Sequence, residues 1–196
     1  MSRASVRRRR RRQQRRESMD FDLLKEIFTW LFQIVLVIGI AFVLVYFVGE
    51  KTNVIGVAME PTLYNQEEVI INKFIYKLTK PERGDVIVFQ PNGNKNTHSN
   101  IKRVVGLPGE TICIQKGVLY IDGKAYESEY VETGIDEAGI IEDDIVLGED
   151  EYFVIGDNVN NSEDSRHANI GNVDKQDIKG KVWFRVSPVK KMGFVK

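Results

Sequence analysis

The chain has 196 residues, of which 28 are basic and 28 are acidic, so its formal net charge is zero. This length predicts one modest domain that buries a core without disulfides. The single cysteine, Cys113, excludes an intramolecular disulfide and a cysteine-based zinc finger. Because it stands between two isoleucines, we interpret it as a small buried hydrophobic residue. Nucleic-acid-binding domains usually carry a basic excess, so the balanced total argues against that class.

The zero net charge averages two unlike parts of the chain. Residues 1–26 contain ten Lys and Arg and four Asp and Glu, a net charge of +6. Residues 27–196 contain eighteen and twenty-four, a net charge of −6. Nine of the basic residues are arginines within residues 3–16, which contain no acid, and we expect this tail to be disordered. The asymmetry predicts a separate role for the tail.

Residues 27–48 form the next element, a run of 22 residues without a charge. A helix that crosses a bilayer needs about 20 apolar residues, because each adds about 1.5 Å. Trp30 and Tyr46 lie near the two ends of the run, as in the aromatic belts of membrane proteins. The run therefore predicts one transmembrane helix.

Two other readings of residues 27–48 are weaker. A buried core helix is seldom uncharged over this length. A cleavable signal peptide has a shorter apolar core and ends in a small-x-small site, which residues 46–50 lack. Arginines before a span favour a cytoplasmic N-terminus, which explains the tail more economically than nucleic-acid binding or nuclear targeting. We expect a single-pass cell-membrane protein with residues 49–196 outside the cytoplasm.

Residues 49–196 have the pattern of a mainly β domain. Asp122-Gly123 after an apolar run is a strong hairpin signal, because both residues tolerate the positive φ of a type I′ turn. Gly-rich residues 127–151 predict a loop-rich segment. An antiparallel sheet or barrel-like fold is expected. The predicted strands are Val69–Phe74, Asp85–Gln90, Ile101–Val105, Thr111–Gln115, Val118–Ile121, Glu151–Ile155 and Lys181–Val186.

Common catalytic patterns are missing from the sequence. We interpret the two histidines, His98 and His167, as exposed or structural, because a triad assembles from residues distant in sequence. There is no His-x-x-x-His pair and no phosphate-binding glycine loop. The sequence therefore predicts no metal and no cofactor.

Four blocks of unusual composition follow one another behind the predicted anchor. They are Gly-Val-Ala-Met-Glu-Pro-Thr-Leu (56–63), Arg-Gly-Asp-Val-Ile-Val-Phe (83–89), Ile-Lys-Arg-Val-Val-Gly-Leu-Pro-Gly-Glu (101–110) and Gly-Asp-Asn-Val-Asn-Asn-Ser-Glu-Asp-Ser-Arg (156–166). In this order they resemble the sequence boxes of bacterial type I signal peptidases, membrane-bound serine proteases that remove signal peptides from exported preproteins. The resemblance covers about residues 54–186 and the anchor, and implies signal peptides and the lipid bilayer as partners.

The family resemblance implies a Ser/Lys dyad, and this chain departs from it at the nucleophile. Ala58 stands where the family has serine, directly before Met59, and Lys102 matches the general base. Alanine has no Oγ, so the chain as written is expected to be inactive. One explanation is replacement of the serine of an active enzyme; the other is a natural pseudo-protease that binds signal peptides without cutting. The other catalytic blocks are intact, which favours replacement.

A buried lysine suits the role of base. A free lysine is protonated at neutral pH, and desolvation lowers its pKa. Lys102 precedes a run of apolar residues, and in strand geometry it shares a face with Val104 while Arg103 faces the other way. A solvated surface lysine is the alternative reading.

The resemblance also implies supporting groups. Ser162 would hydrogen-bond and orient the Lys102 amine, and Asp164 and Arg166 would form a salt bridge; an ordinary polar turn is the alternative reading. Val159-Asn160 replaces the usual Arg-Asp, which puts any charge pairing there in doubt. Gly56, Ala58 and Met59 are the expected oxyanion and substrate-binding positions, with the N–H of residue 58 as one donor.

Chain length agrees with this function. Ten residue steps separate Val48 from Ala58, which reach at most about 33–36 Å, so the site stays close to the outer membrane boundary. An Ala-x-Ala preference would follow from the shallow pockets that the family implies. Two rival readings are a self-cleaving Ser/Lys repressor, which is cytosolic and carries a DNA-binding domain, and a membrane-anchored β scaffold without activity.

Overall fold

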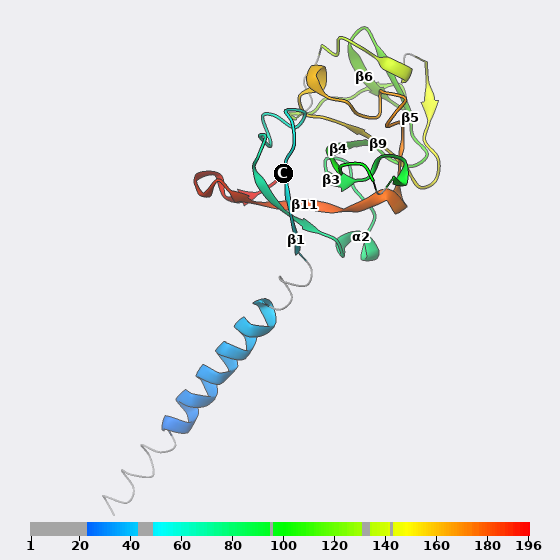
Figure 1. The fold of residues 1–196 in the computed structure, drawn as a ribbon. Coiled ribbons are helices and arrows are strands. Elements are labelled where there is room, and N and C mark those ends of the chain that lie inside the picture. The colour runs from blue at the N-terminus through cyan, green and yellow to red at the C-terminus, as the bar shows by residue number, and fades with distance from the viewer. Residues whose placement is uncertain (1–22, 43–48, 95, 131–133, 142) are drawn as a thin grey trace, which may run out of the picture. The chain divides into compact units, whose positions relative to one another are not determined.

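The structure, a computed structural model, describes residues 23–42, 49–94, 96–130, 134–141 and 143–196. The chain divides into two units, Met1–Phe47 and Val48–Lys196. In the first unit, the described residues form one helix, Leu23–Phe42, long and apolar enough to cross a membrane. In the second, short strands predominate (Figure 1).

The helix agrees with the predicted span where both are described. Residues 27–42 are helical, and residues 43–48 of the predicted span lie outside the described residues, as does the arginine-rich tail. The helix already includes Lys25 and Glu26, which were expected to precede it. A helix can continue past the hydrocarbon core, where water solvates charged side chains. Its apolar side chains are exposed, as a lipid-facing helix requires.

The described residues of the second unit form two antiparallel sheets. The larger has the strand order β1-β2-β11-β3-β4-β9-β10, with β12 also paired to β11, and the smaller has the order β7-β6-β5-β8. The strands are β1 Gly49–Asn53, β2 Glu68–Asn72, β3 Val86–Phe89, β4 Asn100–Gly106, β5 Thr111–Gln115, β6 Val118–Ile121, β7 Lys124–Ala125, β8 Ile145–Val146, β9 Glu151–Ile155, β10 Val173–Asp174, β11 Ile178–Ser187 and β12 Gly193–Phe194.

Short helical turns lie between the strands. One turn of α-helix, α2, covers Ile75–Leu78. The 3-10 turns are η1 Pro91–Gly93, η2 Gly139–Ile141, η3 Val159–Asn161, η4 Lys175–Asp177 and η5 Val189–Lys191. The mainly β, antiparallel fold expected from the sequence is confirmed by this element order.

The long strand β11 lies inside the larger sheet, between β2 and β3. Its register shifts by one residue at several points where it pairs with β2 and β3. Such bulges bend a strand and increase its twist. The sheet therefore curls, and β11 runs across the base of the domain in Figure 1.

Strand β4 lies at the centre of the domain and contributes to all three hydrophobic clusters. Ile101 packs with Met59 and residues of β2 and β3, Val104 packs with residues of β3 and β9, and Val105 packs with residues of β5, β6 and β9. A strand buried on both faces holds its backbone rigidly. This is a suitable platform for a precisely oriented side chain.

Three predicted strands have the same bounds in the structure, namely β5, β6 and β9. The hairpin at Asp122-Gly123 is also confirmed, since both residues have positive φ and Ile121 pairs with Lys124. Strand β1 was not predicted. Its sequence, Gly-Glu-Lys-Thr-Asn, lacks apolar alternation, and pairing with β2 gives it its extended form.

Candidate active site

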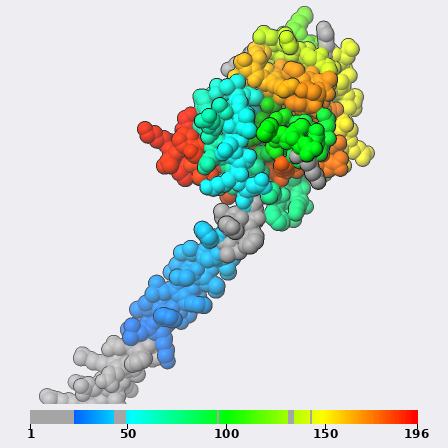
Figure 2. Space-filling view, viewed as in Figure 1, coloured from blue at the N-terminus to red at the C-terminus, as the bar shows by residue number. Residues whose placement is uncertain are grey.

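The candidate site lies where β4, the segment around Ala58 and the loop after β9 meet. The chain around residues 50–60, coloured cyan, lies beside the green chain near residue 100 and below the orange loop on one face in Figure 2. Two hydrogen bonds connect these segments: Asn158 N donates to Ala58 O at 3.0 Å, and Arg103 Nη2 donates to Thr62 Oγ1 at 3.4 Å.

Lys102 is buried, with 6% of its surface exposed. It lies on β4 opposite Ile87 of β3. Burial lowers the pKa of its ammonium, and the charge of Arg166 lowers it further, whereas the carboxylates of Asp164 and Glu163 oppose the shift. The lysine therefore sits beside the loop that carries these three residues. The prediction that β4 carries Lys102 into a desolvated setting is confirmed.

Half of one edge of β4 has no strand partner among the described residues. Strand β3 pairs with Asn100–Arg103, but β9 pairs on the other edge only with Arg103–Gly106. Because Val104 N donates to Asp85 O on the β3 side, alternation directs the N–H and C=O of Ile101 to the unpaired edge. An extended peptide can add at such an edge, next to Lys102.

Gly156 brings the segment of Ala58 and the loop of Ser162 together. A Cβ at position 156 would lie 2.2 Å from Ser162 Oγ and 2.5 Å from Ala58 O, so no larger residue fits without a shift. The Asn158 side chain also donates to Val57 O, at 3.3 Å. Asn158 of the fourth block thus holds the backbone of the first block.

Ala58 is half-buried and is held in place by its neighbours. Met59 is 2% exposed in the core, and Leu63 N donates to Met59 O at 2.8 Å. Gly56 has a φ of +84° and donates its N–H to Asn65 Oδ1. The N–H of Ala58 has no intramolecular partner among the described residues, so it is available to a ligand. The N–H of Gly56, in contrast, is already used.

The ion pair expected between Asp164 and Arg166 is present and buried. Arg166 Nε donates to Asp164 Oδ1 at 2.8 Å, and Asp164 Oδ2 accepts the N–H of Gly156 at 3.1 Å. Arg166 also donates to the carbonyls of Val159 and Glu137. Val159 itself is buried in the core, at a position where the resemblance implied an arginine. The pair therefore fixes the loop that carries Ser162.

The hydrogen bond expected between Ser162 and Lys102 is not found among the described residues. Ser162 Oγ is buried beside Gly156 and has no partner there. A buried hydroxyl without a partner is costly, and groups of this kind concentrate at functional sites. His167 is structural, as expected, since its Nδ1 accepts the N–H of Asp164 at 3.3 Å.

A second buried ion pair was missed at the level of the sequence. Arg103 and Asp157 are fully buried and form two hydrogen bonds of 2.7 Å, Nε to Oδ1 and Nη2 to Oδ2. Arg103 also donates to the carbonyl of Gly84 and stacks on the ring of Tyr130. The sequence did contain a signal for this pair, because Asp157 belongs to the fourth block and Arg103 to the third.

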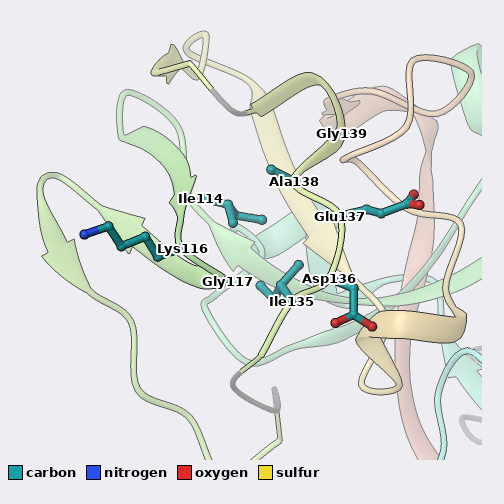
Figure 3. Close-up of a pocket in the computed structure, with 8 residues that line it drawn as sticks. All are labelled: Ile114, Lys116, Gly117, Ile135, Asp136, Glu137, Ala138 and Gly139. Carbon is teal, nitrogen blue, oxygen red and sulfur yellow. The ribbon is translucent and has the colours of Figure 1, made fainter.

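Two cavities lie near these segments. One, of about 500 Å³, lies between the β5–β6 turn and residues 135–139, and none of the expected site residues lines it (Figure 3). Its carboxylates, Asp136 and Glu137, point away from Lys116 in this view, so no charged groups converge there. The other, of about 430 Å³, is lined by Asn100 and Glu163, which are neighbours of the lysine site.

The family model for signal peptidase, peptidase S26, matches residues 27–187. The chain belongs to this family. It is 35% identical over 172 residues to a probable signal peptidase I-2 of Synechocystis, covering 85% of this chain and 74% of the relative. It is 35% identical over 162 residues to signal peptidase I P of Bacillus subtilis subsp. natto, covering 79% and 86%. The family consists of membrane-bound serine proteases that cleave signal peptides.

A solved structure is also similar. Signal peptidase I from Enterococcus faecalis V583 is 30% identical, with a TM-score of 0.42 over 53% of this chain and 97% of that one.

Proposed function

We propose that this chain is an inactivated variant of a membrane-bound serine endopeptidase that cleaves signal peptides from preproteins, with Ala58 in the place of the nucleophilic serine. The observation that carries the proposal is the buried Lys102, whose pKa is lowered beside an unpaired strand edge. Replacement of a serine at position 58 explains why the rest of the site is preserved. A pseudo-protease that only binds signal peptides is the second candidate.

A preprotein would bind by adding a strand. Its residues around the scissile bond pair with the open edge of β4 at Ile101, which presents one N–H and one C=O. The segment that leads to Ala58 flanks this edge and exposes two apolar side chains, Ile55 and Val57. An apolar, extended peptide with small residues suits this edge.

With a serine at position 58, the lysine would act as the base. The neutral Lys102 amine takes the hydroxyl proton while the oxygen attacks the scissile carbonyl carbon. The tetrahedral oxyanion accepts the N–H of residue 58. The intermediate then collapses: the Lys102 ammonium returns its proton to the leaving amine, and the signal peptide stays bound as an ester. Water, deprotonated by Lys102, hydrolyses this ester and frees the signal peptide.

The surrounding groups would act through the lysine and the loop. Ser162 Oγ and Ala58 O both lie against Gly156. From there the Ser162 hydroxyl can bond to the Lys102 amine once the site is occupied. The buried pair of Asp164 and Arg166 keeps this loop in place. Gly56 contributes a turn with positive φ rather than a second oxyanion donor, because its N–H bonds to Asn65.

The membrane topology completes the proposal. The basic tail is proposed to be cytoplasmic, residues 27–48 to span the membrane, and residues 49–196 to form the extracytoplasmic catalytic domain. Protease protection in sealed, oriented vesicles measures this orientation. Digestion of residues 49–196 from the cytoplasmic side would revive the repressor-type reading.

The decisive experiment restores the hydroxyl. The full chain in detergent and its Ala58→Ser variant are incubated with a preprotein that carries an Ala-x-Ala site. We expect cleavage by the variant alone, and loss of that cleavage when Lys102→Ala is added. If Ala58→Ser binds the preprotein but does not cut it, the pseudo-protease candidate is correct. If the double variant still cuts, Lys102 is not the base.

A further inference from the structure

The cavity of about 430 Å³ beside the lysine site has no part in the mechanism above. It shares two chain segments with that site. Asn100 precedes Lys102 by two residues on β4, so the two side chains share a face of the strand. Glu163 directly follows Ser162. The other residues that line the cavity are Pro91, Asn92, Asn94, Thr97, His98, Asn169 and Ile170.

The walls of the cavity are tied together by hydrogen bonds. Asn92 Nδ2 donates to Asn169 O at 2.9 Å, which joins the loop before β4 to the loop after Ser162. Asn169 Nδ2 in turn donates to Glu163 Oε1. This bond holds the exposed Glu163 carboxylate against Asn169 at the wall of the cavity.

The cavity carries a negative charge. Glu163 is the only Asp, Glu, Lys or Arg among the described residues that line it. Neither Lys179, which donates to Ser99 Oγ at 2.8 Å, nor Lys102, on whose ammonium the Glu163 carboxylate acts, is part of the lining. The remaining walls are mostly amide and hydroxyl side chains, which solvate a cation through their oxygens.

Strand geometry determines which substrate residue would face this cavity. Directly opposed residues of neighbouring strands lie on the same face. A peptide residue opposite Ile101 therefore lies on the side of the apolar cluster that contains Ile101 and Met59, which suits a small apolar side chain such as alanine. Its neighbours along the peptide point to the opposite face, which Asn100 and Lys102 share.

We propose that this cavity is a subsite for the middle residue of the Ala-x-Ala site, and that it favours lysine or arginine there. The inference rests on the proposed function. Side chains of an extended peptide point alternately to opposite faces, so the two alanines occupy the Ile101 face and x occupies the Asn100 face. The stem of a long side chain crosses the cavity, and its cationic end meets the Glu163 carboxylate. An acidic x meets the same carboxylate and is repelled.

Binding tests this subsite without any catalysis. The full chain, with Ala58, is titrated in detergent with three fluorescent signal peptides that differ only at x, which is Lys, Gln or Glu. Because Glu163 is exposed, we expect the Lys peptide to bind about five- to tenfold more tightly than the Glu peptide, with the Gln peptide between them. Added salt should reduce this ratio.

Variants assign the preference to one carboxylate. Glu163→Gln should bring the three dissociation constants together, and Glu163→Lys should reverse their order. Glu149→Gln, an exposed acid on the turn before β9, is the matched control and should keep the wild-type order. In the Ala58→Ser background the same ratios should appear in kcat/KM. Any effect of Glu163 on Lys102 is common to all three peptides, so it cancels in these ratios.

Three results would overturn the subsite. Equal binding of the three peptides by the wild-type chain is one, and a lysine preference that persists in Glu163→Gln is another. The third is an equally large preference for lysine over glutamate when these residues are placed after the scissile bond instead of at x. If Ala58→Ser does not cut even the Gln peptide, the proposed function itself fails. If it cuts all three at the same rate, the function stands and the subsite is wrong.

Discussion

The two faces of β4 hold neighbouring cations in opposite ways. On one face, Lys102 is buried without a salt bridge among the described residues, and its pKa is lowered. On the other, Arg103 is equally buried but forms two hydrogen bonds to Asp157. One cation can therefore lose its proton, while the other stays charged and ties the sheet to the loop after β9. The strand places a reactive group and a structural group one residue apart.

The residues that follow β9 act on both faces of β4. Gly156 lies against Ala58 and Ser162 on the lysine side, and Asp157, the next residue, bonds to Arg103. The loop is therefore held by a structural ion pair at the same point at which it shapes the site. Four substitutions separate these two roles.

Removing Asp157 should have the largest effect on stability. Asp157→Ala leaves Arg103 buried without its counter-charge, which typically costs about 3–5 kcal/mol. Urea denaturation of the full chain in detergent measures the change in the free energy of unfolding. Glu149→Ala, which removes an exposed acid, is the control and should change it by less than about 0.5 kcal/mol. A similar small change for Asp157→Ala would show that this pair does not hold the loop.

Exchanging Lys102 for arginine should have the largest effect on activity. In the Ala58→Ser background, Lys102→Arg keeps a cation but cannot supply a neutral base, so we expect kcat to fall by about 10²- to 10⁴-fold. Cleavage of an Ala-x-Ala preprotein is the measurement. The parent Ala58→Ser protein should gain activity with rising pH as the lysine loses its proton, through a pKa below the ordinary lysine value. A pH profile that is flat up to the ordinary lysine pKa would contradict a lysine base.

Gly156→Ala should impair the site more than the fold. In the Ala58→Ser background, the added methyl collides with Ser162 Oγ and with the carbonyl of residue 58, so we expect kcat/KM to fall by about 10- to 100-fold, as catalytic geometry tolerates little displacement. Gly193→Ala is the matched control, because its Cβ would meet no atom within 4 Å. Unchanged activity in Gly156→Ala would mean that this close approach is not needed for catalysis.

The smallest effect concerns the stability contributed by Lys102. Because folding lowers its pKa, the unfolded chain binds more protons between the folded and the ordinary value, and stability rises with pH across that window. Lys102→Met removes the buried amine and this slope. We expect a higher Tm than wild type at pH 7 and a smaller difference as the pH approaches 10.5. A constant difference across this range would contradict the lowered pKa.

The sequence predicted the strands that alternate or bury apolar residues, and missed those that depend on a partner. Thr111–Gln115 and Glu151–Ile155 carry their own apolar pattern, whereas polar β1 is extended only because β2 pairs with it. Two-residue strands such as β10 leave no pattern to detect. Local propensity is weak where tertiary pairing decides the backbone.

Some residues of the candidate site could be predicted from the sequence, and others could not. Lys102 and the pair of Asp164 and Arg166 were found because family boxes carry them. The role of Asp157 needed the structure, since its partner lies 54 residues away on the hidden face of β4. The absence of a bond between Ser162 and Lys102 also needed it, because sequence spacing does not determine the direction of a hydroxyl.

The early end of β9 has a consequence for the choice of substrate. Only a chain that is already extended can take the place beside Ile101, because a helix satisfies its own backbone groups and offers none to a sheet. Under the proposed function, a signal peptide's membrane-embedded core is spared while it remains helical, and a folded mature domain is spared because its strands already have partners. The proposed site would thus select the conformation of the peptide before its side chains, and it would accept the short extended stretch between the helical core and the folded mature domain.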